Sequence, residues 1–319
     1  MEEKIIKNEI CTMSTYLKDN EPTYVDILLG CNGDEKRFVD LYTIIHTNST
    51  ETAYKYKERI LKKVQTYFNE LLTAIKTNDE VKIKYLSKHI HEAKYTKLGY
   101  SENGYGRGFG EIKVSKLVDA IKNSTAYKTN KINDILDAEL YTKNIGVDII
   151  SDLITNLIQD VLGEYTEEKL NELVMGDRIR KIDMYFWNED LKQWQNKKIS
   201  TAVYYVDGFS TEYNYLLVPY SFTAGENQKQ RILDNIFSGC IFTKFKNIIF
   251  DNENAYSEYI KYYTKSKRVT KMNVVSFMND RFGKGTAKIK DGYITSKGLL
   301  DLIERFDDIR KYIEDNIKR

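Results

Sequence analysis

Apolar side chains recur every three or four residues along most of the chain, which is the period of helices with one buried face. The pattern is clearest in the segments 50–75, 79–90, 112–121, 149–162, 166–174 and 295–317, and helices are also expected at 227–237 and 253–264. Gly163 and Glu164 are expected to end one helix, and Thr166 is the expected N-cap of the next. The sequence therefore predicts a mostly helical protein.

Two regions have the composition of strands, with β-branched and aromatic residues in partial alternation. Residues 24–29 and 38–45 are expected to form a β-hairpin, joined by the turn-rich loop 30–34. Residues 181–218 contain KIDMYFW, ISTAVYYV and EYNYLLV and predict a small antiparallel sheet. The expected fold class is α+β, mostly helical, with an N-terminal β-hairpin and a small antiparallel sheet around 181–218.

The change of pattern near residue 178 predicts two domains. Residues 1–178 would form a mainly helical domain that carries a glycine-rich loop and an acidic helix. Residues 179–319 would contain the small sheet and a basic helical region. One continuous domain of this length is also compatible with the pattern.

The glycine-rich loop occupies residues 95–113, and five of the chain's 17 glycines fall between Gly99 and Gly110. Glycine permits positive φ and a close approach of backbone to a ligand. The spacing matches neither GxxxxGK[ST] nor GxGxxG. A helix is expected to begin after Gly110, so the loop and Arg107 could bind an anion; the alternative is an ordinary surface loop. The glycines expected to approach phosphate are Gly104, Gly106 and Gly108.

Polar residues also follow one line on the strongly apolar helix expected at 149–162. Asp148, Asp152 and Asn156 are four residues apart, so they stack along one side of the helix. One interpretation is that Asp148 and Asp152 bind a divalent cation through hard oxygen ligands. The other is that Asp148 caps the helix and Asp152 pairs with a basic side chain.

The net charge of +2, from 49 basic and 47 acidic residues, gives no global indication of nucleic-acid binding. The basic residues are instead concentrated between Lys261 and Lys290, where there are nine of them and one acid, Asp280. This is the best footprint for a polyanion in the chain. The lysines expected to contact phosphate are Lys284, Lys288 and Lys290. A second basic run, at 55–63, is either a solvated helix face or a phosphate contact.

Several classes of protein are disfavoured. The three cysteines are widely spaced and form no zinc motif with the histidines. His89 and His91 would diverge on a helix and could chelate a metal only in an extended segment. The N-terminal residues lack the features of a signal peptide, and no apolar run reaches the length of a membrane span. A cytoplasmic protein without membrane association is expected.

Three segments in this order, HEAKYTKLGYSENGYGRGFG, LDAELYTKNIGVDIISDLITNLI and YNYLLVPYSF, resemble a family of poorly characterised bacterial proteins encoded beside phage-defence or restriction genes. In that family an acidic residue precedes a GYS-type glycine loop, and a glycine–aspartate turn opens a helix with Ser-Asp and Asn. The matching residues here are Glu92, Gly99, Tyr100, Ser101, Gly146, Asp148, Ser151, Asp152 and Asn156. The resemblance covers about 90–220. It implies an antiviral defence role and a functional role for Asp148 and Asp152, and it names no reaction.

Two functions fit these features. The first is a metal-dependent nuclease or other phosphate-directed hydrolase, with Mg²⁺ or Mn²⁺ held by Asp148 and Asp152. Glu111-Ile112-Lys113 has the letters of the ExK part of a PD-(D/E)xK nuclease, although it opens a predicted helix. The candidate catalytic residues are Asp148, Asp152, Glu92, Glu111 and Lys113. The second function is a non-catalytic sensor or binding subunit that recognises nucleic acid, or a partner protein from the same operon.

Overall fold

The computed structural model describes residues 11–30, 33–45, 47–100, 110–123, 127, 132–135, 138, 147–206, 211–225, 288–290 and 293–295. The chain divides into two compact units, one made of Met1–Ser115 with Val147–Thr223 and the other of Lys116–Gly146 with Ala224–Arg319. The first unit contains most of the described helices before residue 178 and also the sheet after it. Its helices and small antiparallel sheets confirm the expected α+β class.

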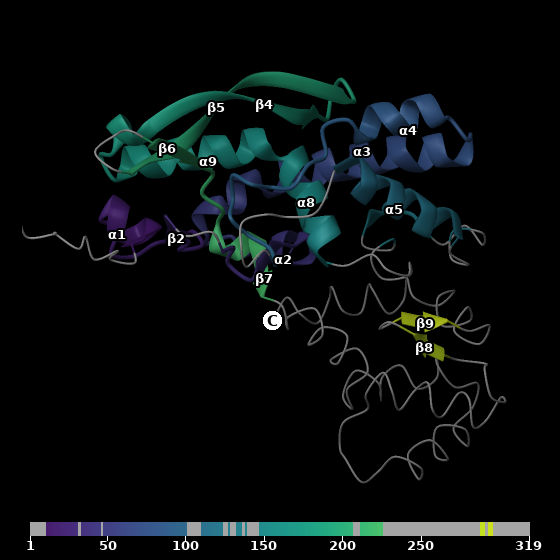
Figure 1. The fold of residues 1–319 in the computed structure, drawn as a ribbon, viewed down its shortest axis with the longest axis horizontal. Coiled ribbons are helices and arrows are strands. Elements are labelled where there is room, and N and C mark those ends of the chain that lie inside the picture. The colour runs from purple at the N-terminus through teal and green to yellow at the C-terminus, as the bar shows by residue number, and fades with distance from the viewer. Residues whose placement is uncertain are drawn as a thin grey trace, which may run out of the picture. The chain divides into compact units, whose positions relative to one another are not determined.

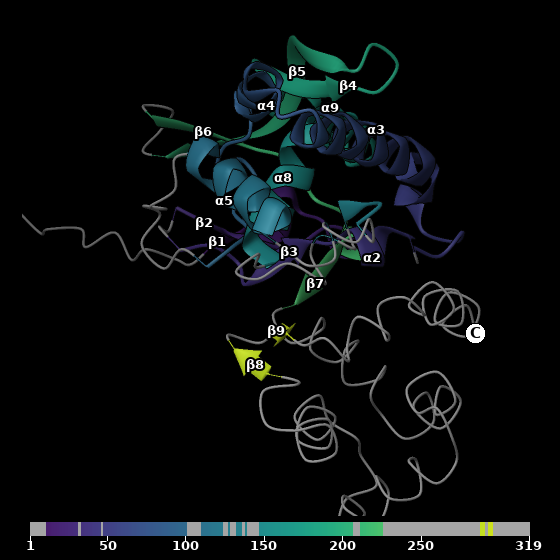
Figure 2. The same ribbon diagram turned by 90° about the vertical axis from the view of Figure 1, so that its right-hand side faces the viewer.

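The described part of the chain contains both helices and short strands. In order they are β1 (Cys11–Thr12), α1 (Met13–Leu17), β2 (Leu28–Leu29), β3 (Arg37–Val39), α2 (Leu41–Ile45), the 3₁₀ turn η1 (Thr52–Tyr56), α3 (Lys57–Lys76), α4 (Glu80–Ser87), α5 (Gly110–Asn123), α8 (Val147–Leu157), α9 (Gln159–Glu172), η2 (Gly176–Arg178), β4 (Ile179–Asn188), β5 (Gln193–Val206), β6 (Thr211–Tyr215), η3 (Tyr220–Phe222), β7 (Thr223–Gly225), β8 (Lys288–Lys290) and β9 (Tyr293–Thr295). Within the first unit, β4 and β5 lie over α9, and α8 lies beneath α9 (Figures 1 and 2).

An N-terminal β-hairpin is present, but its strands differ from those expected. β1 pairs with β2 in antiparallel register, and β3 pairs with the strand that begins at Thr223. Residues 41–45 form a helix, because the Asp40 side chain accepts hydrogen bonds from the backbone N–H of Thr43 at 2.9 Å and its hydroxyl at 2.6 Å. Such an aspartate satisfies the first turn of a helix and stops the strand before it.

The predicted sheet at 181–218 is confirmed as the antiparallel order β4-β5-β6. Trp187 and Trp194 are directly opposite each other on β4 and β5, and both rings pack edge-on against Tyr67 of α3. The indole of Trp187 donates to the Thr66 hydroxyl, and that of Trp194 donates to the carbonyl of Leu86. These aromatic contacts fix one end of the sheet to α3 and α4.

The buried segment at 149–162 is two helices and not one. α8 ends at Leu157, and α9 begins at Gln159, after Ile158. Gly163, expected to stop a helix, lies inside α9, where a Cβ atom would be 2.3 Å from the Ile199 side chain of β5. The glycine is therefore needed for the close approach of α9 to the sheet, and the helix continues through it.

Four basic residues of the run at 55–63 pair with acidic side chains in the described part of the chain, and two of them, Lys55 and Lys62, remain more than half exposed. Lys55 pairs with Glu168 of α9, and Lys62 pairs with Asp190 at the β4–β5 turn. Arg59 reaches Asp160 and Glu164 of α9. The basic face of α3 therefore holds α9 and the sheet in place.

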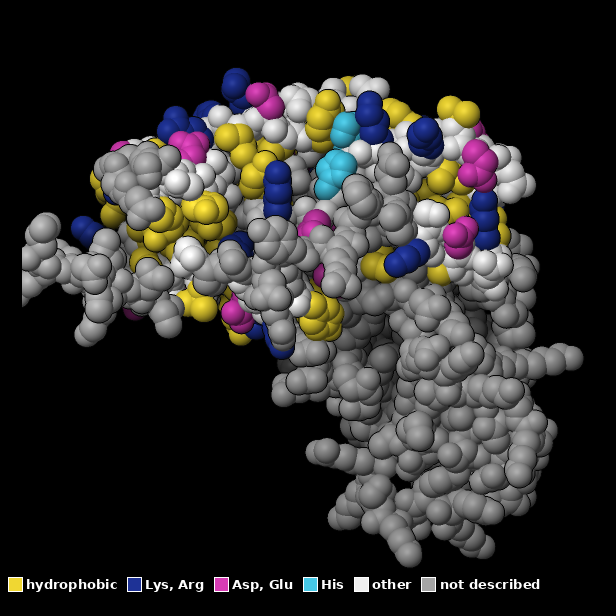
Figure 3. All heavy atoms as spheres, in the orientation of Figure 1, with side chains coloured by type: hydrophobic (Ala, Val, Ile, Leu, Met, Phe, Trp, Pro, Cys, Tyr) yellow, Lys and Arg dark blue, Asp and Glu magenta, His cyan; other side chains and the backbone are white. Residues whose placement is uncertain are grey.

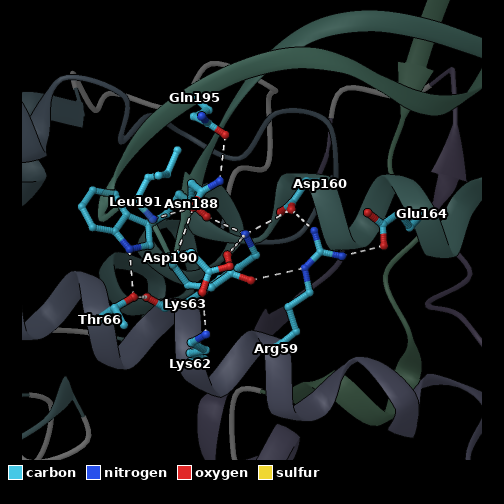
Figure 4. Close-up of polar contacts among 12 residues, drawn as sticks. Arg59, Lys62, Lys63, Thr66, Asp160, Glu164, Asn188, Asp190, Leu191 and Gln195 are labelled. Atoms are coloured by element: carbon cyan, nitrogen blue, oxygen red, sulfur yellow. Dashed lines mark hydrogen bonds and ion pairs between the residues drawn. The ribbon is translucent and has the colours of Figure 1, made fainter.

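Lys63 is the centre of this network (Figure 4). Its ammonium group is fully buried, 2.7 Å from Glu189 and 3.1 Å from Asp160, and it donates to the carbonyl of Trp187. Oδ2 of Asp160 is shared between Lys63 and Arg59, while its Oδ1 has no hydrogen-bond partner among the described residues. Burial raises the pKa of Asp160, and the charges of Lys63 and Arg59 act against that rise.

Candidate functional site

The polar line of α8 faces one segment of the chain, residues 91–99, which leads into the glycine-rich loop. Nδ2 of Asn156 donates to the carbonyl of His91 at 2.7 Å, and Oδ1 of Asp152 accepts from the backbone N–H of Ala93 at 3.3 Å. A Cβ atom built on Gly99 would be 3.5 Å from Oδ1 of Asp148. The three residues at spacing four therefore meet successive points of the same segment.

A second segment, at 34–35, meets Gly99 from another direction. The backbone N–H of Glu35 donates to the carbonyl of Lys97, and the N–H of Gly99 donates to the carbonyl of Glu35. The same built Cβ atom would be 3.5 Å from Oδ2 of Asp34. Gly99 thus lies between two carboxylates, and we call Asp34, Gly99 and Asp148 the Gly99 junction.

The backbone of Gly99 has a φ of +149°, a conformation that residues with a Cβ atom rarely adopt. The Gly99→Ala variant is expected to lose about 1–3 kcal/mol of unfolding free energy through backbone strain. Urea denaturation followed by tryptophan fluorescence measures this loss. Gly225→Ala is the control, since a Cβ atom there meets nothing within 4 Å. Equal stability of the two variants would show that the backbone at Gly99 is not strained.

The helix and turn residues of the site have different surroundings. Asp152 is 4% exposed and accepts a hydrogen bond from the backbone N–H of Ala93. Asp148, in the first turn of α8, is half-buried. The N-cap position expected for Asp148 is therefore wrong, because α8 already begins at Val147. Ser151, beside the line on α8, accepts from the backbone N–H of Val39 at 2.9 Å and ties α8 to β3.

The remaining predicted site residues divide into four groups. Glu92 is half-buried in the segment that α8 holds. Glu111 and Lys113 lie in the first turn of α5, so their ExK sequence is helical as expected, and their side chains are not described. Lys288 and Lys290 lie in β8, which pairs with β9. Five residues lie outside the described part of the chain: Arg107, Gly104, Gly106, Gly108 and Lys284.

A divalent cation was predicted at Asp148 and Asp152. Among the described residues, no group of three or more His, Cys, Asp or Glu side chains is placed to hold a metal ion. The Gly99 junction nevertheless offers two carboxylates, and Mg²⁺ is often held by one or two protein carboxylates together with water and substrate phosphate. Asp34 was not singled out in the sequence. Its only signal there was its place after Gly33 in a turn.

The fold and the site define an α+β protein in which polar side chains of the buried helix α8 bond the backbone of the segment that leads to Gly99 and the rest of the glycine-rich loop. The chain belongs to a family described as a domain of unknown function (DUF8370), whose model matches residues 18–229. The match runs through the whole sheet β4-β5-β6 and ends shortly after β7. No curated protein and no solved structure matches the chain. None of the described helices is both long and apolar enough to cross a membrane.

Proposed function

We propose that this chain is a nucleic-acid-directed component of a bacterial anti-phage defence system and that its reactive centre is the Gly99 junction. The observation that supports this most directly is the position of Gly99 between the carboxylates of Asp34 and Asp148. Gly99 is the first glycine of the glycine-rich loop, whose backbone and Arg107 were predicted to hold phosphate. A carboxylate pair beside a loop that binds phosphate would be able to hold a metal ion against a phosphodiester, where the ion could act as a Lewis acid.

In this proposal the residues have separate roles. Asp34 and Asp148 would hold Mg²⁺ or Mn²⁺, which would neutralise phosphate charge and lower the pKa of a bound water. Asp152 and Asn156 are positioning residues, because they bond the backbone of the segment that carries Gly99. Glu92 and Glu111 stay candidates for completing the site.

The test is cleavage of single- and double-stranded DNA and RNA by the full-length chain with Mg²⁺ or Mn²⁺. Asp148→Asn keeps the size of the side chain and removes its charge, so cleavage should fall at least tenfold, about 1.4 kcal/mol of barrier. Asp183→Asn is the matched control, because Asp183 is an exposed aspartate on β4 paired only with Lys198 in the described structure. Cleavage that persists in both Asp148→Asn and the Asp148→Asn/Asp152→Asn double variant would contradict the nuclease proposal.

A non-catalytic sensor or binding subunit is the second candidate, and the state of Asp152 favours it. This aspartate is buried, and its Oδ1 is already occupied by a backbone N–H. This contact gives Asp152 a structural role that does not require a metal ion. In that case the chain should bind nucleic acid, or a partner protein from the same operon, without cleaving. Binding should then weaken steeply with salt and be insensitive to EDTA.

A further inference from the structure

An exposed aromatic stack lies where the end of α4 meets β4. The rings of His89 and Tyr185 are parallel within 15°, with centroids 3.6 Å apart. Trp194 lies beside His89, at 5.6 Å, and belongs to the buried aromatic cluster. Tyr185 remains 43% exposed although His89 covers part of its ring. A rigid core therefore presents a flat aromatic surface to solvent.

Lysines are concentrated in the segment that carries His89, and Lys88 is close enough to act on the pKa of His89. From Lys82 to Lys97 there are five lysines and a single acid, Glu92. Lys84, Lys88 and Lys94 are exposed, and none of them makes an ion pair within the described structure. The one acidic neighbour on the same face of β4, Asp183, is paired with Lys198 across the strands. The two described histidines lie together on one face, with Lys or Arg, hydrophobic and acidic side chains around them (Figure 3).

His89 itself does not add to this charge at neutral pH. Burial, together with the charges of Lys88 and His91, lowers its pKa to about 4. A neutral imidazole can stay stacked on the tyrosine ring without desolvating a charge. The surface therefore combines a neutral aromatic platform with a rim of unpaired lysines.

We infer that the His89–Tyr185 stack is a binding platform for single-stranded nucleic acid. An unpaired base stacks on the exposed part of Tyr185, while Lys84, Lys88 and Lys94 contact the phosphates on either side. Only a single strand or a frayed end exposes the base faces that such a platform needs, and stacking on aromatic rings tolerates any sequence. The inference rests on the proposed function, because it names the form of nucleic acid that the chain would recognise.

The experiment is a fluorescence-anisotropy titration of the full-length chain with short labelled DNA and RNA, single- and double-stranded, in EDTA so that no cleavage occurs. Tyr185→Ala should weaken single-strand binding about tenfold, the loss expected for one stacked base. Tyr185→Phe keeps the ring and should bind as wild type does. Tyr213→Ala, which removes an equally exposed tyrosine of the same sheet, is the matched control. Lys88→Gln should reduce the salt slope by about one.

The outcomes separate the two proposals. If wild type binds nucleic acid but Tyr185→Ala and Tyr213→Ala bind equally well, the platform is wrong and the proposed function stands. If wild type binds no form of nucleic acid, the proposed function itself fails. If nucleic-acid binding is unchanged in Tyr185→Ala while association with a partner protein is lost, the surface is a protein docking site. A preference for duplex over single strand would also overturn the inference.

Discussion

Lys63→Met is expected to lower the free energy of unfolding by about 3–5 kcal/mol, the cost of removing one partner from a buried ion network. Lys63 is fully buried, and its ammonium group lies between the carboxylates of Asp160 and Glu189. Methionine fills a similar volume but leaves those carboxylates short of one positive charge. Arg59 remains near both and offsets only part of the loss. The carbonyl of Trp187 also loses its buried donor.

Lys62→Met is the matched control for this prediction. It makes the same chemical change one position earlier on α3, where the pair with Asp190 is well exposed on both sides. Exposed pairs contribute about 0–1 kcal/mol, so this variant should be nearly as stable as wild type. Urea denaturation followed by the fluorescence of Trp187 and Trp194 compares the two. Equal losses in the two variants would show that burial of the network adds nothing to stability.

The loss in Lys63→Met should also depend on pH. Burial already raises the pKa of Asp160, and removing Lys63 removes the first of the charges that oppose this rise. A carboxyl whose folded-state pKa lies above its unfolded value destabilises the fold when ionised, and protonation relieves the penalty. The difference between wild type and variant should therefore shrink as the pH falls from about 7 to about 5. A difference that grows over this interval would contradict the assignment to Asp160.

Helices and strands were predictable from the sequence where the periodicity or composition of one continuous segment indicates them. The helical period over 50–75 reappears in α3, and the β-branched and aromatic run over 181–218 became the sheet β4-β5-β6. Strand partners were not predictable in the same way. β3 pairs with a strand near Thr223, and amphipathic pattern carries no information about which distant segment supplies a partner. The capping side chain of Asp40 then decided that 41–45 is helical, against its strand-like composition.

The buried ion network around Lys63 shows a different limit of prediction from the sequence. Lys63 occupies the apolar stripe of α3, between Ile60 and Tyr67, and that position was a signal of burial. The sequence could not say that Asp160 and Glu189 would compensate its charge, because both come from elements distant in the chain. Periodicity identifies which face of a helix is inside. It does not identify which residues meet that face.

The candidate site was also predictable from the sequence only in part. The spacing of Asp148, Asp152 and Asn156 predicted a line of polar groups on one side of α8, and the described structure contains it. The sequence did not indicate that this polar line contacts the backbone of residues 91–99, and only the three-dimensional structure shows it. The role of Asp34 was not anticipated at all, because the sequence does not indicate that Asp34 and Asp148 both approach Gly99.

The contact between α9 and the sheet allows a second large effect to be predicted. Gly163 lies in the interior of α9, where glycine costs about 0.5–1 kcal/mol relative to alanine through its backbone entropy. Propensity alone therefore predicts that Gly163→Ala stabilises the protein. The structure predicts the opposite. A Cβ atom would be 2.3 Å from Cγ2 of Ile199 and 3.2 Å from the backbone carbonyl of Ser200, and both residues are buried on β5.

Gly163→Ala is accordingly expected to lower the free energy of unfolding by about 2–3 kcal/mol, because α9 and β5 must move apart to relieve the clash. The measurement is urea denaturation of the full-length chain. Gly176→Ala, where the nearest atom to a Cβ is Oδ1 of Asn171 at 3.7 Å, should be close to neutral. Ile199→Ala should be less harmful in the Gly163→Ala background than in wild type, because it removes the methyl group that clashes. Additive losses in the double variant would mean that the backbone of Ser200, and not the Ile199 side chain, sets the distance between α9 and the sheet.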